Sequence, residues 1–170
     1  MQPFTQGWLD SMCGIYSIVN AERFLNKSTE DESQKLFNDI ITFLAKKRKL
    51  KDIMIDGVNH KMMSLLVETF FSDKFTEVLA NKKGFSNLKE WWNYTRGFMD
   101  MGNRAIILSL GGKRDHLTVI ESMSERAMRL LDSNWTKAIK RSECRMLNPN
   151  KDDPKDRYTI YPYQCWYITK

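Results

Sequence analysis

Hydrophobic spacing divides the chain into a helical first half and a strand-rich second half. Between Glu32 and Arg48, apolar residues recur at the intervals of one helix face, which predicts an amphipathic helix. Similar spacing predicts further helices over about 11–26, 59–72 and 86–99. Apolar or alternating runs bounded by turn residues predict strands over about 104–110, 116–121, 127–132, 157–161 and 164–169. The segment 74–80 fits either a strand or a helix.

The order of these elements predicts an α+β fold, in which the first helix packs on an antiparallel sheet made by the second half. The run 105–110 is apolar throughout, so this strand is expected in the interior of the sheet. A chain of 170 residues has the length of one domain with a real hydrophobic core. We therefore expect a single domain over residues 1–170, with a surface loop at 148–155.

Composition and charge narrow the classes of protein that fit this chain. No apolar run approaches the length of a membrane span and no signal peptide precedes the first helix, which predicts a cytoplasmic protein. The net charge is +6, and basic residues gather at 46–49 and 82–83. No nucleic-acid-binding motif accompanies them, so a solvated helix end explains these residues better than a nucleic-acid partner.

The three cysteines, Cys13, Cys144 and Cys165, are an odd number without Cys-x-x-Cys spacing. This pattern predicts neither a disulfide framework nor a zinc ribbon, and no cofactor or metal is expected. Cys144 and Cys165 are interpreted as structural residues. The sequence does not indicate an oligomeric state.

Cys13 follows a polar loop and opens the first predicted helix. Either Asp10 or Ser11 can serve as the N-cap, which places Cys13 in the first helical turn. Free backbone N–H groups and the positive end of the helix dipole favour a thiolate there, and a thiolate is the form that attacks carbonyl groups. The alternative is that Cys13 is a small buried hydrophobic residue without chemistry of its own.

A nucleophilic cysteine needs a base, and the chain has two histidines. His60 starts a predicted helix and is interpreted as a cap or surface residue. His116 follows a glycine-containing loop and opens a predicted strand. If the following hairpin is symmetric about Ser124, Asp132 lies directly opposite His116, and its carboxylate fixes the imidazole tautomer and raises its basicity. Alternatively, Asp132 only starts the turn that follows it.

Together, the Gln6–Ser17 stretch with Cys13 at a helix start, the strand-opening His116 and the strand-ending Asp132 resemble the Cys-His-Asp arrangement of papain-like cysteine peptidases. The small size and the sixteen-residue step from His116 to Asp132 most resemble the bacterial double-glycine leader peptidases and their stand-alone relatives. The resemblance spans residues 6 to about 135 and implies a papain-like fold, with the active site at the junction of helices and sheet.

The resemblance also implies roles for residues around the triad. Gln6 corresponds to the glutamine that donates to the oxyanion, although its loop to Cys13 is one residue longer than is usual in the family. That loop must therefore bulge, or another group must donate. Asn134 is an alternative third group, with Trp135 as a shield over its hydrogen bond; strand pairing favours Asp132. Trp135 is equally explained as a partly buried aromatic at the sheet edge.

The expected chemistry is attack of Cys13 on a carbonyl, with His116 carrying the proton and water resolving the thioester. Hydrolysis of a peptide, an isopeptide or a glutamine amide fits these residues, and so does acyl transfer, because fold and triad do not determine the substrate. The expected partner is a protein or peptide substrate. The alternative, from a different class, is a non-catalytic binding or regulatory protein on the same fold.

Overall fold

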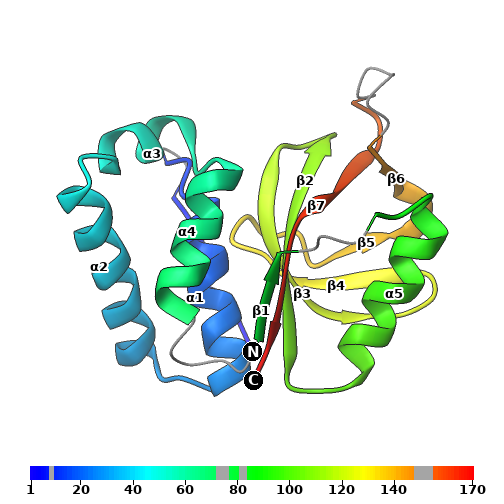
Figure 1. Ribbon diagram of the computed structural model, residues 1–170, viewed down its shortest axis with the longest axis horizontal. Helices are drawn as coiled ribbons and strands as arrows, with labels where there is room; N and C mark the ends of the chain where they lie inside the picture. Colours follow the sequence, from blue (N-terminus) through cyan, green and yellow to red (C-terminus); the bar gives the residue numbers. More distant parts are fainter. Residues whose placement is uncertain (8–9, 72–76, 81–83, 148–154) are drawn as a thin grey trace.

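A computed structural model describes residues 1–7, 10–71, 77–80, 84–147 and 155–170 (Figure 1). The helices in these ranges are α1 (Cys13–Asn26), α2 (Glu30–Lys46), α3 (Leu50–Asp56), α4 (His60–Phe71), α5 (Leu88–Asp100) and a short 3-10 helix (Arg141–Glu143). The strands are β1 (Glu77–Ala80), β2 (Arg104–Gly112), β3 (His116–Met123), β4 (Ala127–Leu131), β5 (Ala138–Lys140), β6 (Cys144–Met146) and β7 (Tyr158–Thr169). The predicted α+β class is confirmed.

The strands form one sheet in the order β1-β7-β2-β3-β4-β5, with β6 paired to β7. All pairs are antiparallel except β6 with β7, so the predicted antiparallel sheet is in fact mixed. As its apolar sequence predicted, β2 lies in the interior of the sheet. Helices α1 to α4 lie on one side of the sheet and α5 lies on the other (Figure 1).

Each face of the sheet buries its own hydrophobic core. Along β2, Ala105 and Ile107 join the core shared with α1, α2 and α4, whereas Ile106 and Leu108 join the core that contains α5. Successive side chains of a strand point to opposite faces, so one strand supplies both cores. Burying a side chain of this size contributes about 1.5–3 kcal/mol, and these cores fix α1 against the sheet.

The start of α1 differs from the sequence-based expectation. Met12 occupies the N-cap position and no side chain caps the helix, so neither Asp10 nor Ser11 is the N-cap. The Asp10 carboxylate accepts hydrogen bonds from the backbone N–H groups of Met12, at 3.0 Å, and Gly7, at 2.9 Å. Asp10 therefore stabilises the loop before the helix. Ser11 instead donates to a backbone carbonyl of α3. Cys13 is nevertheless the first helical residue.

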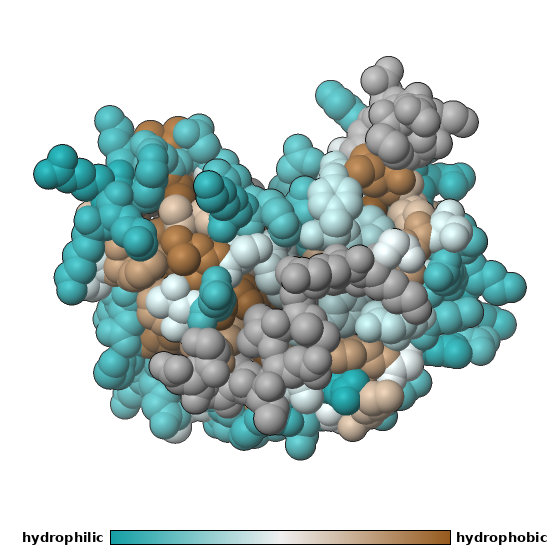
Figure 2. Space-filling model, viewed as in Figure 1, coloured by the Kyte–Doolittle hydropathy of each residue, from teal (hydrophilic) through white to brown (hydrophobic). Residues whose placement is uncertain are grey.

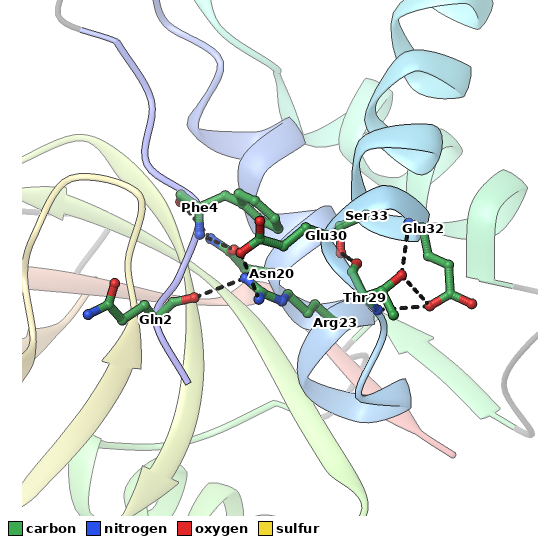
Figure 3. A network of polar contacts seen from close by, with 8 residues as sticks. All are labelled: Gln2, Phe4, Asn20, Arg23, Thr29, Glu30, Glu32 and Ser33. Carbon is green, nitrogen blue, oxygen red and sulfur yellow. Dashed lines mark hydrogen bonds and ion pairs between the residues drawn. The ribbon is translucent and has the colours of Figure 1, made fainter.

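Several predicted boundaries are corrected. The second helix starts at Glu30 because Thr29 and Glu32 form a capping box (Figure 3). The two strands expected after residue 156 are one strand, β7, whose register with β2 shifts between Ile160 and Cys165, a stretch that contains Pro162. Helix α3 and strands β5 and β6 were not predicted, because three to seven residues are too few for a periodic pattern.

Some predictions fall on other parts of the chain. The segment 77–80 is strand β1, whereas 74–76, the basic pair 82–83 and most of the loop 148–155 lie outside the described residues. Within the described ranges, every helix is too short or too polar to cross a membrane.

Candidate active site

His116 and Asp132 form a buried pair on the β3–β4 hairpin. His116 opens β3 and Asp132 directly follows β4, and the two residues are 7% and 2% exposed. The Nε2 atom of His116 lies 2.7 Å from Oδ2 of Asp132. The hairpin therefore brings together two residues that are sixteen positions apart in the chain.

The predicted register of this hairpin is wrong. Val119 lies opposite Leu131, so continuing the ladder places Asp132 opposite Thr118 and not opposite His116. Two features of the hairpin are the reason: its turn, between Met123 and Met128, lies later in the chain than a turn centred on Ser124, and a register shift between Ile120 and Ser122 removes one residue of the resulting offset. The resulting offset is two residues, which keeps Asp132 on the same face of the sheet as His116. The carboxylate consequently reaches the imidazole diagonally, within the range of next-nearest cross-strand neighbours.

The turn after β4 orients the Asp132 carboxylate. Its Oδ1 accepts hydrogen bonds from the backbone N–H groups of Asn134, at 2.7 Å, and Thr136, at 3.1 Å. Because Oδ1 is engaged by the turn, Oδ2 is the atom that faces His116. Asp132 thus acts both as the first residue of a turn and as the partner of the histidine, so both sequence-based interpretations apply to it.

The charges of the site are strongly coupled. Burial alone would lower the pKa of His116, but the hydrogen bond to Asp132, the neighbouring Cys13 side chain and the negative charge of Asp132 raise it to about 9. Burial likewise opposes ionisation of Asp132, yet the hydrogen bond and positive charge of His116, with Thr118 and the Thr136 N–H, hold the pKa of Asp132 below its ordinary value. The pair is therefore an imidazolium beside a carboxylate at neutral pH.

Cys13 approaches this pair from the other layer of the fold. It is the first residue of α1, it is partly exposed, and it lines the same cavity as His116, whose pKa it helps to raise. Since Nε2 of His116 is engaged by Asp132, Nδ1 is the nitrogen left for Cys13. In the first helical turn the Ile15 N–H donates to the Met12 carbonyl at 2.9 Å, so the N–H groups of Cys13 and Gly14 are the first-turn donors beside the sulfur.

Gly14 allows this approach of helix and strand. A Cβ atom at Gly14 would lie 3.0 Å from Leu117 Cδ1 and 3.1 Å from Val58 Cβ. Leu117 neighbours His116 on β3, so with a larger residue at position 14 the Leu117 and Val58 side chains would have to yield by a few tenths of an ångström. Glycine allows the close packing without that adjustment.

Gln6 lies in the same cavity as Cys13. Its Oε1 accepts a hydrogen bond from the Ser133 hydroxyl at 3.1 Å, and its Nε2 donates to the Asp10 carbonyl at 3.3 Å. The second hydrogen of Nε2 remains for a ligand in the cavity. The longer loop between Gln6 and Cys13 is closed by the hydrogen bonds of Asp10 described above.

The remaining candidates do not take the predicted catalytic roles. Asn134 and His60 line the cavity, but the Asn134 backbone N–H donates to the Asp132 carboxylate, and Asp132 holds the position beside His116. Trp135 is 70% exposed, so it neither shields that hydrogen bond nor packs as a partly buried aromatic. His60 is exposed at the start of α4, and its ring lies 5.2 Å from that of Trp166.

A cavity of about 530 Å³ opens over Cys13 and His116. Its walls come from the loop before α1, the α3–α4 connection, the β2–β3 turn and β7. Figure 2 shows the surface hollowed between the helices and the sheet at the end of the molecule where α3 and β2 lie. A polypeptide segment or a side-chain amide has room to enter this cavity.

Sequence reasoning missed two residues that support the site. Asn20 is fully buried in α1 and Ser133 is 2% exposed beside Asp132. Asn20 carried a usable signal, because a polar residue between Val19 and Ala21 interrupts the apolar face of the first helix. Ser133 carried none, since serine is an ordinary turn residue.

We predict that Cys13 is the thiol that reacts selectively in the folded protein. Cys144 and Cys165 are buried, and burial raises the pKa of the Cys144 thiol to about 12 and that of Cys165 further. At pH 7, iodoacetamide should modify Cys13 alone, and all three thiols after unfolding in urea, as read by peptide mass spectrometry. Modification of Cys144 at a comparable rate in the folded protein would contradict this assignment.

No protein-family model, curated protein or solved structure matched this chain. The site is therefore described by its own geometry. Among the described residues, no group of three or more His, Cys, Asp or Glu side chains is arranged to hold a metal ion.

Proposed function

We propose that the protein is a papain-like cysteine hydrolase that cleaves a peptide, an isopeptide or a glutamine amide. One observation carries the proposal: His116, buried and hydrogen-bonded to Asp132 at 2.7 Å, lines one cavity with Cys13, a cysteine at the start of a helix that helps to raise the pKa of His116. A nucleophile, a base and a group that orients the base are the three components of a catalytic triad.

The geometry supports the following reaction. The Cys13 sulfur attacks the carbonyl carbon while His116, as an imidazolium, lies beside it. The backbone N–H of Cys13 and the Gln6 amide donate to the developing oxyanion. His116 then gives its Nδ1 proton to the leaving amine, and the thioester forms. His116 next takes a proton from water, which attacks the thioester and releases Cys13.

The fold is consistent with this class. A helix that begins at the nucleophile packs on a sheet whose hairpin carries the base, as expected from the resemblance to bacterial double-glycine leader peptidases and their stand-alone relatives. A cytoplasmic location belongs to the same proposal.

A substrate screen tests the proposal. Wild type and Cys13→Ala are compared on peptide, isopeptide and glutamine-amide substrates, with Cys144→Ala as the control for loss of a buried cysteine. We expect at least one substrate to be turned over by wild type and Cys144→Ala but not by Cys13→Ala. Equal rates of product formation for wild type and Cys13→Ala on every substrate would favour a binding or regulatory protein.

Replacing Gln6 should weaken transition-state stabilisation specifically. We expect Gln6→Ala to lower kcat by about a hundred- to a thousandfold, because one oxyanion donor is lost, while Cys13 alkylation stays near the wild-type rate. Gln164→Ala is the matched control, since Gln164 lines the same cavity. Unchanged turnover of Gln6→Ala would assign the oxyanion to other donors, and loss of alkylation as well would indicate a role in shaping the loop.

A further inference from the structure

The N-terminal segment, residues 2–6, is held at both ends by residues outside the proposed triad. At one end, the Asn20 side chain of α1 accepts a hydrogen bond from the Phe4 N–H at 2.8 Å and donates one to the Phe4 carbonyl at 3.0 Å (Figure 3). A single buried amide thus satisfies both backbone groups of Phe4, as a neighbouring strand would.

Arg23, one turn further along α1, reinforces this end. Its guanidinium lies 4.6 Å from the centre of the Phe4 ring and donates to the Gln2 carbonyl at 3.2 Å. Figure 3 shows Arg23 between the segment and Glu30 of α2, with which it forms an ion pair at 3.7 Å. Asn20 and Arg23 of α1 therefore hold the backbone at Gln2 and Phe4, and Glu30 of α2 contacts Arg23 from the other side.

At the other end, Ser133 holds Gln6. The Gln6 N–H donates to the Ser133 carbonyl at 3.0 Å, and the Ser133 hydroxyl donates to Gln6 Oε1 at 3.1 Å. Because Oε1 is engaged in this way, Nε2 is the end of the amide that is directed to the Asp10 carbonyl and the cavity. Ser133 thereby selects the orientation in which Gln6 is a donor.

The position of Asn20 links this segment to the nucleophile. Cys13 and Asn20 are seven residues apart, which is two helical turns, so both lie on one side of α1. Phe4 and Gln6 are only two residues apart, about 7 Å along an extended chain. One rigid helix therefore sets the position of Cys13 directly and that of Gln6 through Phe4.

We propose that Asn20 and Ser133 are positioning residues, which together hold Gln6 as an oxyanion donor beside Cys13. The inference rests on the proposed function and extends it to residues that do not touch the substrate. A misplacement of about 1 Å in a catalytic site can lower the rate about a hundredfold, which is why the segment is held at two points.

A double-mutant cycle with Gln6→Ala tests the proposal. We expect Asn20→Ala and Ser133→Ala each to lower kcat about tenfold or more, with KM within about twofold of wild type, since an oxyanion exists only in the transition state. Cys13 alkylation should stay at the wild-type rate. In the Gln6→Ala background neither substitution should lower kcat further. Asn26→Ala, on the same helix but away from the segment, is the matched control.

Arg23→Met provides a second route if Asn20→Ala does not fold. It loosens the same end of the segment from a partly exposed position and should give a smaller loss of kcat that also disappears in the Gln6→Ala background. An equal loss of kcat in both backgrounds, or no loss at all, would overturn the positioning role. Absence of any Cys13-dependent turnover in wild type would overturn the proposed function, and this inference with it.

Discussion

Replacing Cys13 by alanine should abolish turnover, and replacing His116 as well should lower it no further. In the proposed mechanism the two residues act as a unit, because the histidine has no nucleophile to assist once the sulfur is removed. In a triad of this kind, loss of the nucleophile alone and loss of all members each lower kcat by a factor on the order of 10⁶. The measurement is kcat for Cys13→Ala, His116→Ala and the double variant on the substrate found in the screen.

Cys144→Ala is the matched control, since it removes a thiol that is 4% exposed and lies in the core that contains α5, on the side of the sheet opposite α1. It should lose stability without a comparable loss of kcat. Substantial turnover by Cys13→Ala would exclude Cys13 as the nucleophile.

The second large effect is expected for Asp132→Asn. Asparagine has nearly the same shape but no charge, so His116 loses the partner that raises its pKa to about 9, while burial, which lowers that pKa, remains. At neutral pH we expect kcat to fall by up to about 10⁴-fold, because the imidazolium and the productive tautomer are no longer favoured. Asn134→Ala is the control for the alternative third group.

The pH dependence gives an independent reading of the same pair. In wild type, kcat should decline as the pH rises through about 9, where His116 loses the proton needed by the leaving amine. In Asp132→Asn this decline should move to lower pH. The stability of the folded protein should also decrease with rising pH. The pKa of His116 is higher in the folded state than in the unfolded state, so the contribution of His116 to the free energy of unfolding is full below about pH 6.5 and is lost as the pH rises through about 9. A decline that stays at the same pH in both proteins would show that another group titrates.

The long helices and the central strand followed from periodicity, because each rests on many residues with one spacing. Helix α3 and strands β5 and β6 did not, since tertiary contacts form them and their lengths carry no period. The partnership of His116 and Asp132 was predicted through a wrong register. It survives because a shift of two residues leaves a side chain on its original face.

The N-cap and the support of Gln6 could not be predicted, because they depend on long-range contacts. Aspartate is a common N-cap residue, yet the carboxylate oxygens of Asp10 accept hydrogen bonds from the loop before the helix. Ser133 hydrogen-bonds to Gln6, from which it is separated by 127 positions in the sequence. The burial of Trp135 was also not predictable from the sequence. An aromatic residue is buried only where a neighbouring element covers it, and Trp135 is 70% exposed.

The origin of the site in two layers has a consequence for partial unfolding. His116 and Asp132 belong to one hairpin, whereas Cys13 lies beside them only while α1 packs on the sheet. A small separation of these layers would disconnect the sulfur and leave the ion pair intact. The proposed activity would then be lost at a lower denaturant concentration than the cooperative unfolding of the sheet. Turnover measured along a denaturant gradient would therefore report on the packing of α1 against the sheet.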